Sequence, residues 1–165
     1  AKVEQLRQQA DLQAIDLAQV VRSVALDLSP LIAEKDIDFE IETVPARIQS
    51  HEWMLGELAR NLLHNAIKHT PAGGILAVRL VTDANRQAVM TVSDGGPGIS
   101  AELSTRLYQP FSAGNVRHGS GLGLAICHEI VRAIGGTIFL ENREAHGHIE
   151  GLNATVRLPL ADNEP

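Results

Sequence analysis

The chain has 165 residues, of which 44% are hydrophobic, 21% are charged and only 3% are aromatic, as expected for one globular domain with an aliphatic core. Its formal net charge of −6 argues against a general nucleic-acid-binding protein, which needs a basic surface. The single cysteine, Cys127, excludes a disulfide framework and a cysteine zinc site, and no apolar run approaches the ~18 residues of a membrane span.

The N-terminal residues 1–14 are polar with sparse apolar positions, and we expect the end of an exposed helix followed by a linker. Because the chain begins without an initiator methionine, we expect it to be cut from a longer protein. The predicted domain then spans residues 15–160, and residues 161–165 form a tail.

Residues 16–30 predict a helix. Asp16 is a suitable N-cap, the apolar residues between positions 17 and 28 recur at helical spacing, and Pro30 is expected to bend or shorten the last turn. The following residues 36–42, DIDFEIE, alternate strictly between polar and apolar side chains, which predicts a half-buried strand.

A second helix is predicted over residues 52–69, where TPAGG at 70–74 ends it. Residues 75–83 and 87–94 predict two strands joined by a short turn at 84–86.

The C-terminal third predicts a glycine turn, a short helix near residues 101–108 and a loop ending in GSGLG. A helix over residues 122–134 is stopped by Gly135-Gly136, and two closing strands are predicted at 137–142 and 153–160. Strands in hairpins with helices between them indicate an α+β fold. We predict a two-layer α/β sandwich, with a mixed sheet of about five strands covered on one face by about three helices.

The helix at 52–69 carries an unusual polar face. Glu57, Asn61, Asn65 and Lys68 fall within an arc of roughly 80°, opposite the leucines and alanines. Such a face is ordinarily a solvated surface, but two asparagines one turn apart are poor helix formers. An amide oxygen is a suitable Mg²⁺ ligand, and Lys68 could meet a phosphate, so a nucleotide site is the alternative.

The stretch VSDGGPGIS at 92–100 follows a predicted strand. It could be no more than a tight turn. Asp94, however, ends an apolar strand, where a carboxylate needs a partner, and an adenine amine would serve as the donor. Gly96 and Gly98 would let the backbone approach the base closely.

The stretch HGSGLGLAI at 118–126 contains Gly119, Gly121 and Gly123. This partial dinucleotide-binding pattern is weak evidence alone, and the absence of a directly preceding strand counts against a Rossmann turn. Because it opens a predicted helix, its backbone N–H groups could hold phosphate.

Together, the order and spacing of NLLHNAIKHTP, DGGPGI and GSGLGLAI resemble the N box, the first glycine box and the second glycine box of sensor histidine kinases. That family shares its Bergerat-type nucleotide-binding fold with gyrase, a heat-shock chaperone and the mismatch-repair ATPases. The resemblance covers roughly residues 15–160. It departs from the usual pattern at Gly95, where the family usually has Asn, and in the F box, which lacks its arginine.

The resemblance implies a site for ATP and Mg²⁺. It assigns Asn65 to Mg²⁺, Asn61 to the phosphate and metal environment, and Lys68 to phosphate. It places Asp94 on the adenine amine, and residues 100–120 in a mobile lid. The remaining residues that it implies for ATP binding are Gly96, Gly98, Ile99, Arg117, Gly119, Gly121, Leu122 and Gly123.

Members of this family phosphorylate a histidine, so each histidine of the present chain is a possible acceptor. The family's acceptor lies in a separate dimerisation domain, in a motif followed by Thr-Pro, and neither His51-Glu52 nor His128-Glu129 has that continuation. We interpret both as surface or packing residues. His146-Gly147-His148 offers two metal ligands without a third and predicts a turn.

The resemblance therefore implies the catalytic domain of a protein histidine kinase. It would transfer the γ-phosphoryl group to a histidine of a separate dimerisation domain, for relay to a response regulator. The full-length protein would be a homodimer anchored in the inner membrane, with this domain cytoplasmic; the fragment alone would be monomeric. The alternatives are an ATPase or serine kinase of the same superfamily, and a regulatory nucleotide-binding module.

Overall fold

The computed structural model describes residues 12–100 and 122–162. In chain order its elements are β1 (Gln13–Asp16), α2 (Leu17–Asp27), α3 (Ser29–Glu34), β2 (Asp38–Thr43), β3 (Arg47–Ser50), α4 (Glu52–His69), β4 (Ile75–Thr82), β5 (Gln87–Asp94), α6 (Leu122–Ile134), β6 (Thr137–Ala145) and β7 (His148–Pro159). The short helix expected near residues 101–108 lies outside the described residues.

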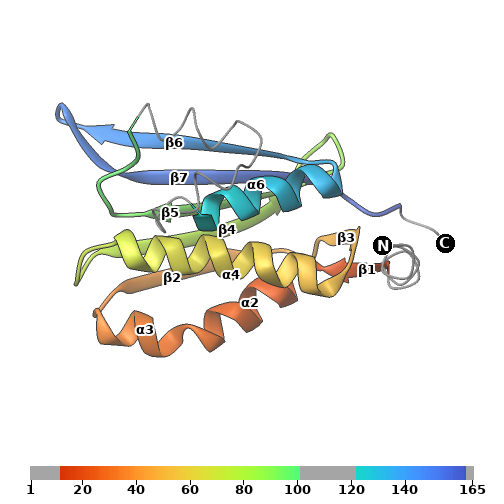
Figure 1. The fold of residues 1–165 in the computed structure, drawn as a ribbon, viewed down its shortest axis with the longest axis horizontal. Coiled ribbons are helices and arrows are strands. Elements are labelled where there is room, and N and C mark those ends of the chain that lie inside the picture. Colours follow the sequence, from red (N-terminus) through yellow and green to blue (C-terminus); the bar gives the residue numbers. More distant parts are fainter. Residues whose placement is uncertain (1–11, 101–121, 163–165) are drawn as a thin grey trace.

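The main sheet has five strands in the order β2-β4-β5-β7-β6. β2 runs parallel to β4, whereas the remaining neighbours are antiparallel. Helices α2, α4 and α6 lie together on one side of the sheet (Figure 1). The prediction of a two-layer, mixed five-stranded sheet covered on one face by about three helices is therefore confirmed.

Alternation along the strands places the core between the two layers. In β4 and β5 every second residue is buried, because successive strand side chains point to opposite faces. The helices contribute their apolar stripes to the same core. Its largest fully buried side chains are Leu17, Val21, Ile48, Leu55, Leu58, Leu63, Leu76, Val78, Leu80, Met90, Val131 and Leu158.

A second, two-stranded sheet was not predicted. β1 pairs antiparallel with β3, from Gln13 opposite Ser50 to Asp16 opposite Arg47. Within the described residues, the first strand begins at Gln13. The predicted N-cap is present: Asp16 Oδ1 accepts hydrogen bonds from the backbone N of Ala18 and of Ala46, both at 3.0 Å.

The predicted effect of Pro30 is also seen. α2 ends at Asp27, and a separate helix α3 begins at Ser29 with the proline in its first turn. Proline is tolerated in a first turn because the N–H it lacks would have no partner within the helix.

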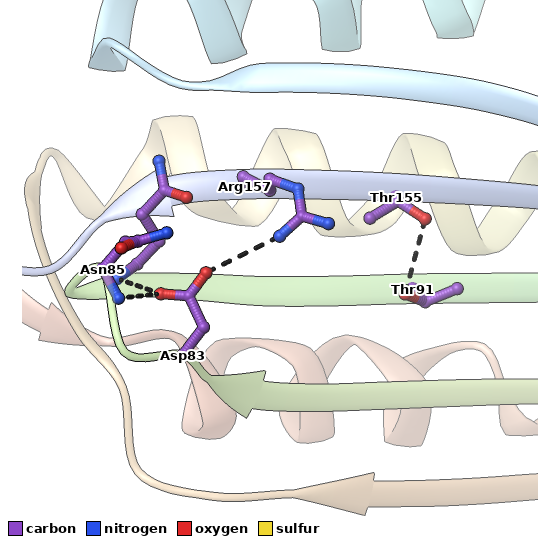
Figure 2. A network of polar contacts seen from close by, with 6 residues as sticks. Asp83, Asn85, Thr91, Thr155 and Arg157 are labelled. Atoms are coloured by element: carbon purple, nitrogen blue, oxygen red, sulfur yellow. Dashed lines mark hydrogen bonds and ion pairs between the residues drawn. The ribbon is translucent and has the colours of Figure 1, made fainter.

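The β4–β5 turn is closed by a side chain (Figure 2). Asp83 Oδ1 accepts hydrogen bonds from the backbone N of Asn85 at 2.9 Å and of Gln87 at 3.1 Å. Its Oδ2 lies 3.6 Å from a guanidinium nitrogen of Arg157 on β7. The turn thereby fixes the register of β5 against its two neighbours at the end of the sheet remote from Asp94.

The closing hairpin is longer than predicted. β6 and β7 extend to Ala145 and back from His148, with a register shift between Arg143 and Glu144. His146 and Gly147 both have positive φ, which fits a tight hairpin turn, and so confirms the predicted turn. Among the helices that the structure describes, none is both long and apolar enough to cross a membrane.

Candidate nucleotide site

Helix α4 has the predicted bounds and presents its asparagines on the predicted face. Leucine and alanine side chains of α4 are buried, whereas Asn61 and Asn65 are half-buried and Lys68 is exposed. Asn61 Nδ2 donates to the Glu57 backbone carbonyl at 2.8 Å and to Glu57 Oε1 at 2.9 Å. These two bonds use the donor end of the amide, so its oxygen remains for another partner.

Asp94 ends β5 as a buried carboxylate. Its Oδ1 accepts hydrogen bonds from the backbone N of Gly96 at 2.9 Å and of Leu152 at 3.2 Å. Burial raises the pKa of Asp94 above its usual range. The two backbone donors, and the nearby charges of His69 and Arg143, lower it and oppose that rise. Within the part of the chain that the structure describes, both hydrogen bonds go to Oδ1, which leaves Oδ2 for a ligand donor.

The glycines of the first glycine box lie against neighbouring elements. A Cβ on Gly96 would stand 2.5 Å from the carbonyl oxygen of His69, well inside van der Waals contact. Gly98 has a φ of +79° and packs against the side chains of Asn142 and Ile149. Glycine is therefore required at both positions, and the backbone there is unshielded by side chains of its own.

One cavity brings several of the predicted residues together. Its volume is about 80 Å³, smaller than the roughly 300–1,000 Å³ of whole ligand pockets, so it suits only part of a nucleotide, such as the edge of a base. It is lined by Asn65, His69, Asp94, Gly98, Ile99, Leu124 and Leu152.

Several predicted site residues do not line this cavity. Lys68 does not line this cavity and is exposed near the end of α4. Leu122 begins α6, and Gly123 lies beside Asn61, since a Cβ there would be 3.3 Å from Asn61 Oδ1. The Asn61 oxygen is thus turned toward the start of α6. Arg117, Gly119 and Gly121, with the expected lid, lie outside the described residues.

Two residues that the sequence analysis did not single out fix the end of α4. Thr70 Oγ1 donates to the Ala66 carbonyl at 2.8 Å and accepts from the backbone N of Gly95 at 3.2 Å. Lys35 Nζ donates to the carbonyls of Ile67 at 2.8 Å and Lys68 at 3.1 Å. The asparagine helix and the first glycine box are therefore tied directly to each other.

The cavity residues missed from the sequence differ in how they could have been found. His69 lies one turn after Asn65, so helical spacing already placed it on the same face. Leu152 and Leu124 carry no such signal, because only the sheet register and the packing of α6 bring them to Asp94. Asn142, which bonds the backbone of Ile99, was also missed.

Two of the histidine interpretations can be compared with the structure. His51 is buried at the start of α4, where its ring stacks on that of Trp53 with centroids 6.4 Å apart, in agreement with a packing role. His128 is half-buried on α6. No group of three or more potential metal-ligating His, Cys, Asp or Glu side chains occurs among the described residues.

This arrangement of a helix with two asparagines, a buried strand-end aspartate and close-packed glycines agrees with comparisons to known proteins. The family model of histidine kinase-, DNA gyrase B- and HSP90-like ATPases matches residues 51–162, which is more than half of the chain. The chain belongs to this family.

Relatives of this chain include sensor histidine kinases. It is 31% identical to the sensor histidine kinase TmoS of Ectopseudomonas mendocina in an alignment of 166 positions, which covers 97% of the chain and 17% of that protein. It is 34% identical over 127 residues to the signal transduction histidine-protein kinase/phosphatase MprB of Mycolicibacterium smegmatis, 75% of the chain and 26% of that protein. The chain thus spans about a quarter or less of these two relatives.

The fold of the chain matches that of solved histidine kinase structures. The catalytic domain of histidine kinase ThkA superposes with a TM-score of 0.75 at 27% identity, covering 90% of this chain and 96% of that one. ThkA has also been solved in complex with the response regulator protein TrrA. The chain therefore has the fold of a histidine kinase catalytic domain.

Proposed function

We propose that this domain binds MgATP and donates the γ-phosphoryl group to a histidine of a separate dimerisation domain. The observation that carries the proposal is that Asp94, Asn65, Gly98 and Ile99 line one cavity in a domain with the fold of histidine kinase catalytic domains. A carboxylate for the base and an amide for the metal then lie at one site.

The chemistry of these residues fits an adenine nucleotide. Asp94 Oδ2 would accept from the exocyclic amine of adenine, whereas guanine offers a carbonyl oxygen there and would be repelled. Gly98 lines the cavity with its backbone, and the absence of a side chain on Gly96 and Gly98 lets this loop pack closely on His69 and Asn142. The cavity would take the edge of the base, with the phosphates extending toward Asn61 and the start of α6.

The side-chain amide oxygens of Asn65 and Asn61 are suitable ligands for magnesium. Asn65 would ligate it, Asn61 would contribute to the same environment, and Lys68 would meet a phosphate, with Arg117, Gly119, Gly121, Leu122 and Gly123 closing the phosphate end. The ion would neutralise charge on the phosphates. The acceptor imidazole nitrogen would form a bond to the γ-phosphorus while the bond to the bridging oxygen breaks, and ADP would leave.

Asn61 favours a kinase over an ATPase. Hydrolysis needs a group that accepts a proton from the attacking water, and a neutral amide has no useful basicity. Glu57 is the nearest carboxylate on the same face, and its Oε1 already accepts from Asn61 Nδ2 at 2.9 Å. We therefore infer that Glu57 orients the amide and does not act as a base.

For the whole protein we propose the arrangement that the resemblance to sensor histidine kinases implies. It would be a homodimer, anchored in the inner membrane, with this domain on the cytoplasmic side. A response regulator aspartate would receive the phosphoryl group from the histidine. The complex of ThkA with TrrA supports a regulator as partner.

Phosphate release from saturating MgATP tests the choice between kinase and ATPase. We expect turnover far below ~1 s⁻¹, since general-base catalysis contributes about 10²–10⁴-fold. Asn61→Glu should raise it modestly, and Asn61→Ala serves as the matched control. Turnover of ~1 s⁻¹ or more in the unmodified chain would favour the ATPase alternative.

A further inference from the structure

The loop after Asp94 is held at both ends by side chains from one row of the main sheet. Asp94 of β5 lies opposite Leu152 of β7, which lies opposite Asn142 of β6. At the near end Asp94 Oδ1 accepts from the backbone N of Gly96 at 2.9 Å. At the far end Asn142 holds Ile99. The loop is therefore held by one side chain from β5 and by one from β6.

The far anchor is a pair of hydrogen bonds to one residue. Asn142 Oδ1 accepts from the backbone N of Ile99 at 2.9 Å, and Asn142 Nδ2 donates to the carbonyl oxygen of Ile99 at 2.9 Å. A primary amide offers one acceptor and one donor side by side, so it satisfies both backbone groups of a residue as a neighbouring strand would. An aspartate or a leucine cannot make both bonds.

The same side chain also sets the position of the loop relative to the cavity. Gly98, at φ +79°, packs directly on Asn142 Oδ1, and a Cβ there would also stand 2.8 Å from Ile149 Cγ2. Gly98 and Ile99 line the cavity together with Asp94. Asn142 itself does not line it, so its influence on a ligand would pass through these two residues.

We propose that Asn142 is a positioning residue of the nucleotide site, which acts through Ile99 to hold the part of the cavity wall that Gly98 and Ile99 form. The proposal rests on the proposed ATP-binding function. Without the two bonds Ile99 would lose its side-chain anchor on β6, and part of the binding free energy would be spent on ordering this part of the loop. Nucleotide affinity should then fall although every residue of the cavity is retained.

The test compares three variants by calorimetry with ADP, by unfolding in denaturant without nucleotide, and by hydrogen exchange of the Ile99 amide. Asn142→Ala should bind ADP about tenfold more weakly, the factor that corresponds to roughly one neutral hydrogen bond. Its Ile99 amide should exchange faster while amides of β4 keep their protection. Asn142→Asp, which keeps the acceptor and the volume but loses the donor, should also weaken ADP binding. Asn85→Ala, in the turn at the far end of β5, is the control. It should change neither the affinity for ADP nor the exchange rate of the Ile99 amide.

Each outcome decides the inference. Wild-type affinity for ADP in both Asn142 variants would overturn it, and a loss of unfolding free energy alone would then assign Asn142 a purely structural role. If Asn142→Ala does not fold, Asn142→Asp decides by the same criterion. Absence of ADP binding by the unmodified chain would overturn the proposed function as well, so the two failures are distinguishable.

Discussion

Replacing Asp94 by asparagine isolates the group that we assign to the adenine base. Asparagine has nearly the same shape, and its side-chain oxygen can still accept from the backbone N of Gly96 and Leu152, as Asp94 Oδ1 does. The change therefore keeps the loop anchored. What it removes is the negative charge and the second acceptor, which becomes an NH₂ donor that faces the adenine amine.

The expected loss of affinity follows from that single interaction. A hydrogen bond to a charged group contributes about 1.5–3 kcal/mol, so Asp94→Asn should weaken ADP binding roughly 10- to 150-fold. GTP should gain relative to ATP, because the new donor can meet the guanine carbonyl oxygen. The variant should thus narrow the preference for adenine as well as reduce affinity.

The same substitution should not destabilise the fold at neutral pH. Because burial raises the pKa of Asp94 above the ordinary 3.8, the native state holds this proton more firmly than the unfolded state. The stability that Asp94 contributes is therefore present at low pH and is lost as the pH rises through the native pKa. Asp94→Asn removes this pH dependence. As the pH rises from the ordinary carboxyl pKa of 3.8 through the raised pKa of Asp94, the unfolding free energy of the variant should therefore increase relative to that of the wild type.

Calorimetric titration with ADP, ATP and GTP, together with denaturant unfolding between acidic and neutral pH, measures both effects. Asp94→Ala is the control for shape. It leaves two buried backbone N–H groups without an acceptor and should lose both stability and affinity. Equal affinity of the unmodified chain for ATP and GTP would refute the assignment of Asp94 to the base.

Three further changes test other parts of the account. Asn65→Ala should weaken MgATP far more than metal-free ATP in calorimetry, and an equal loss of both would instead indicate a folding role. His51 begins α4 in extended geometry without a side-chain cap, and its Nδ1 has no hydrogen-bond partner in the described structure. His51→Asn should therefore raise the unfolding free energy by about 1 kcal/mol, whereas His64→Asn, exposed within the same helix, should not. Lys35→Met should lower the unfolding free energy by about 1 kcal/mol, because the last carbonyls of α4 lose the hydrogen bonds from Lys35. An unchanged unfolding free energy in denaturant would contradict that role.

Local patterns in the sequence predicted α4 and α6 at their observed bounds. Both are long amphipathic segments with clear stops, at Thr70-Pro71 and Gly135-Gly136. β1 and β3 were missed because four-residue strands have too little alternation to be distinguished from loops. Their pairing brings together residues more than thirty positions apart, which no local pattern reports.

The site likewise contains residues that local motifs predicted and residues that only the tertiary structure brings together. Asp94, Asn65, Gly98 and Ile99 lie in recognisable motifs, and the structure gathers these four around one cavity. Leu152 lines the cavity, and Asn142 bonds Ile99 beside it, only because of the register of β6, β7 and β5. The beginning of β7 was predicted at residue 153, five residues late, so the sequence could not place either of them beside Asp94.

Phosphoryl transfer to a supplied acceptor tests the central claim most directly. The chain would be incubated with γ-labelled ATP and Mg²⁺, alone and with the separately purified dimerisation domain of its full-length protein. We predict that the chain alone stays unlabelled and that acid-labile label appears on a histidine of the added domain. Stable occupancy of ATP without any transfer, or label on one of the seven histidines of this chain, would contradict the account.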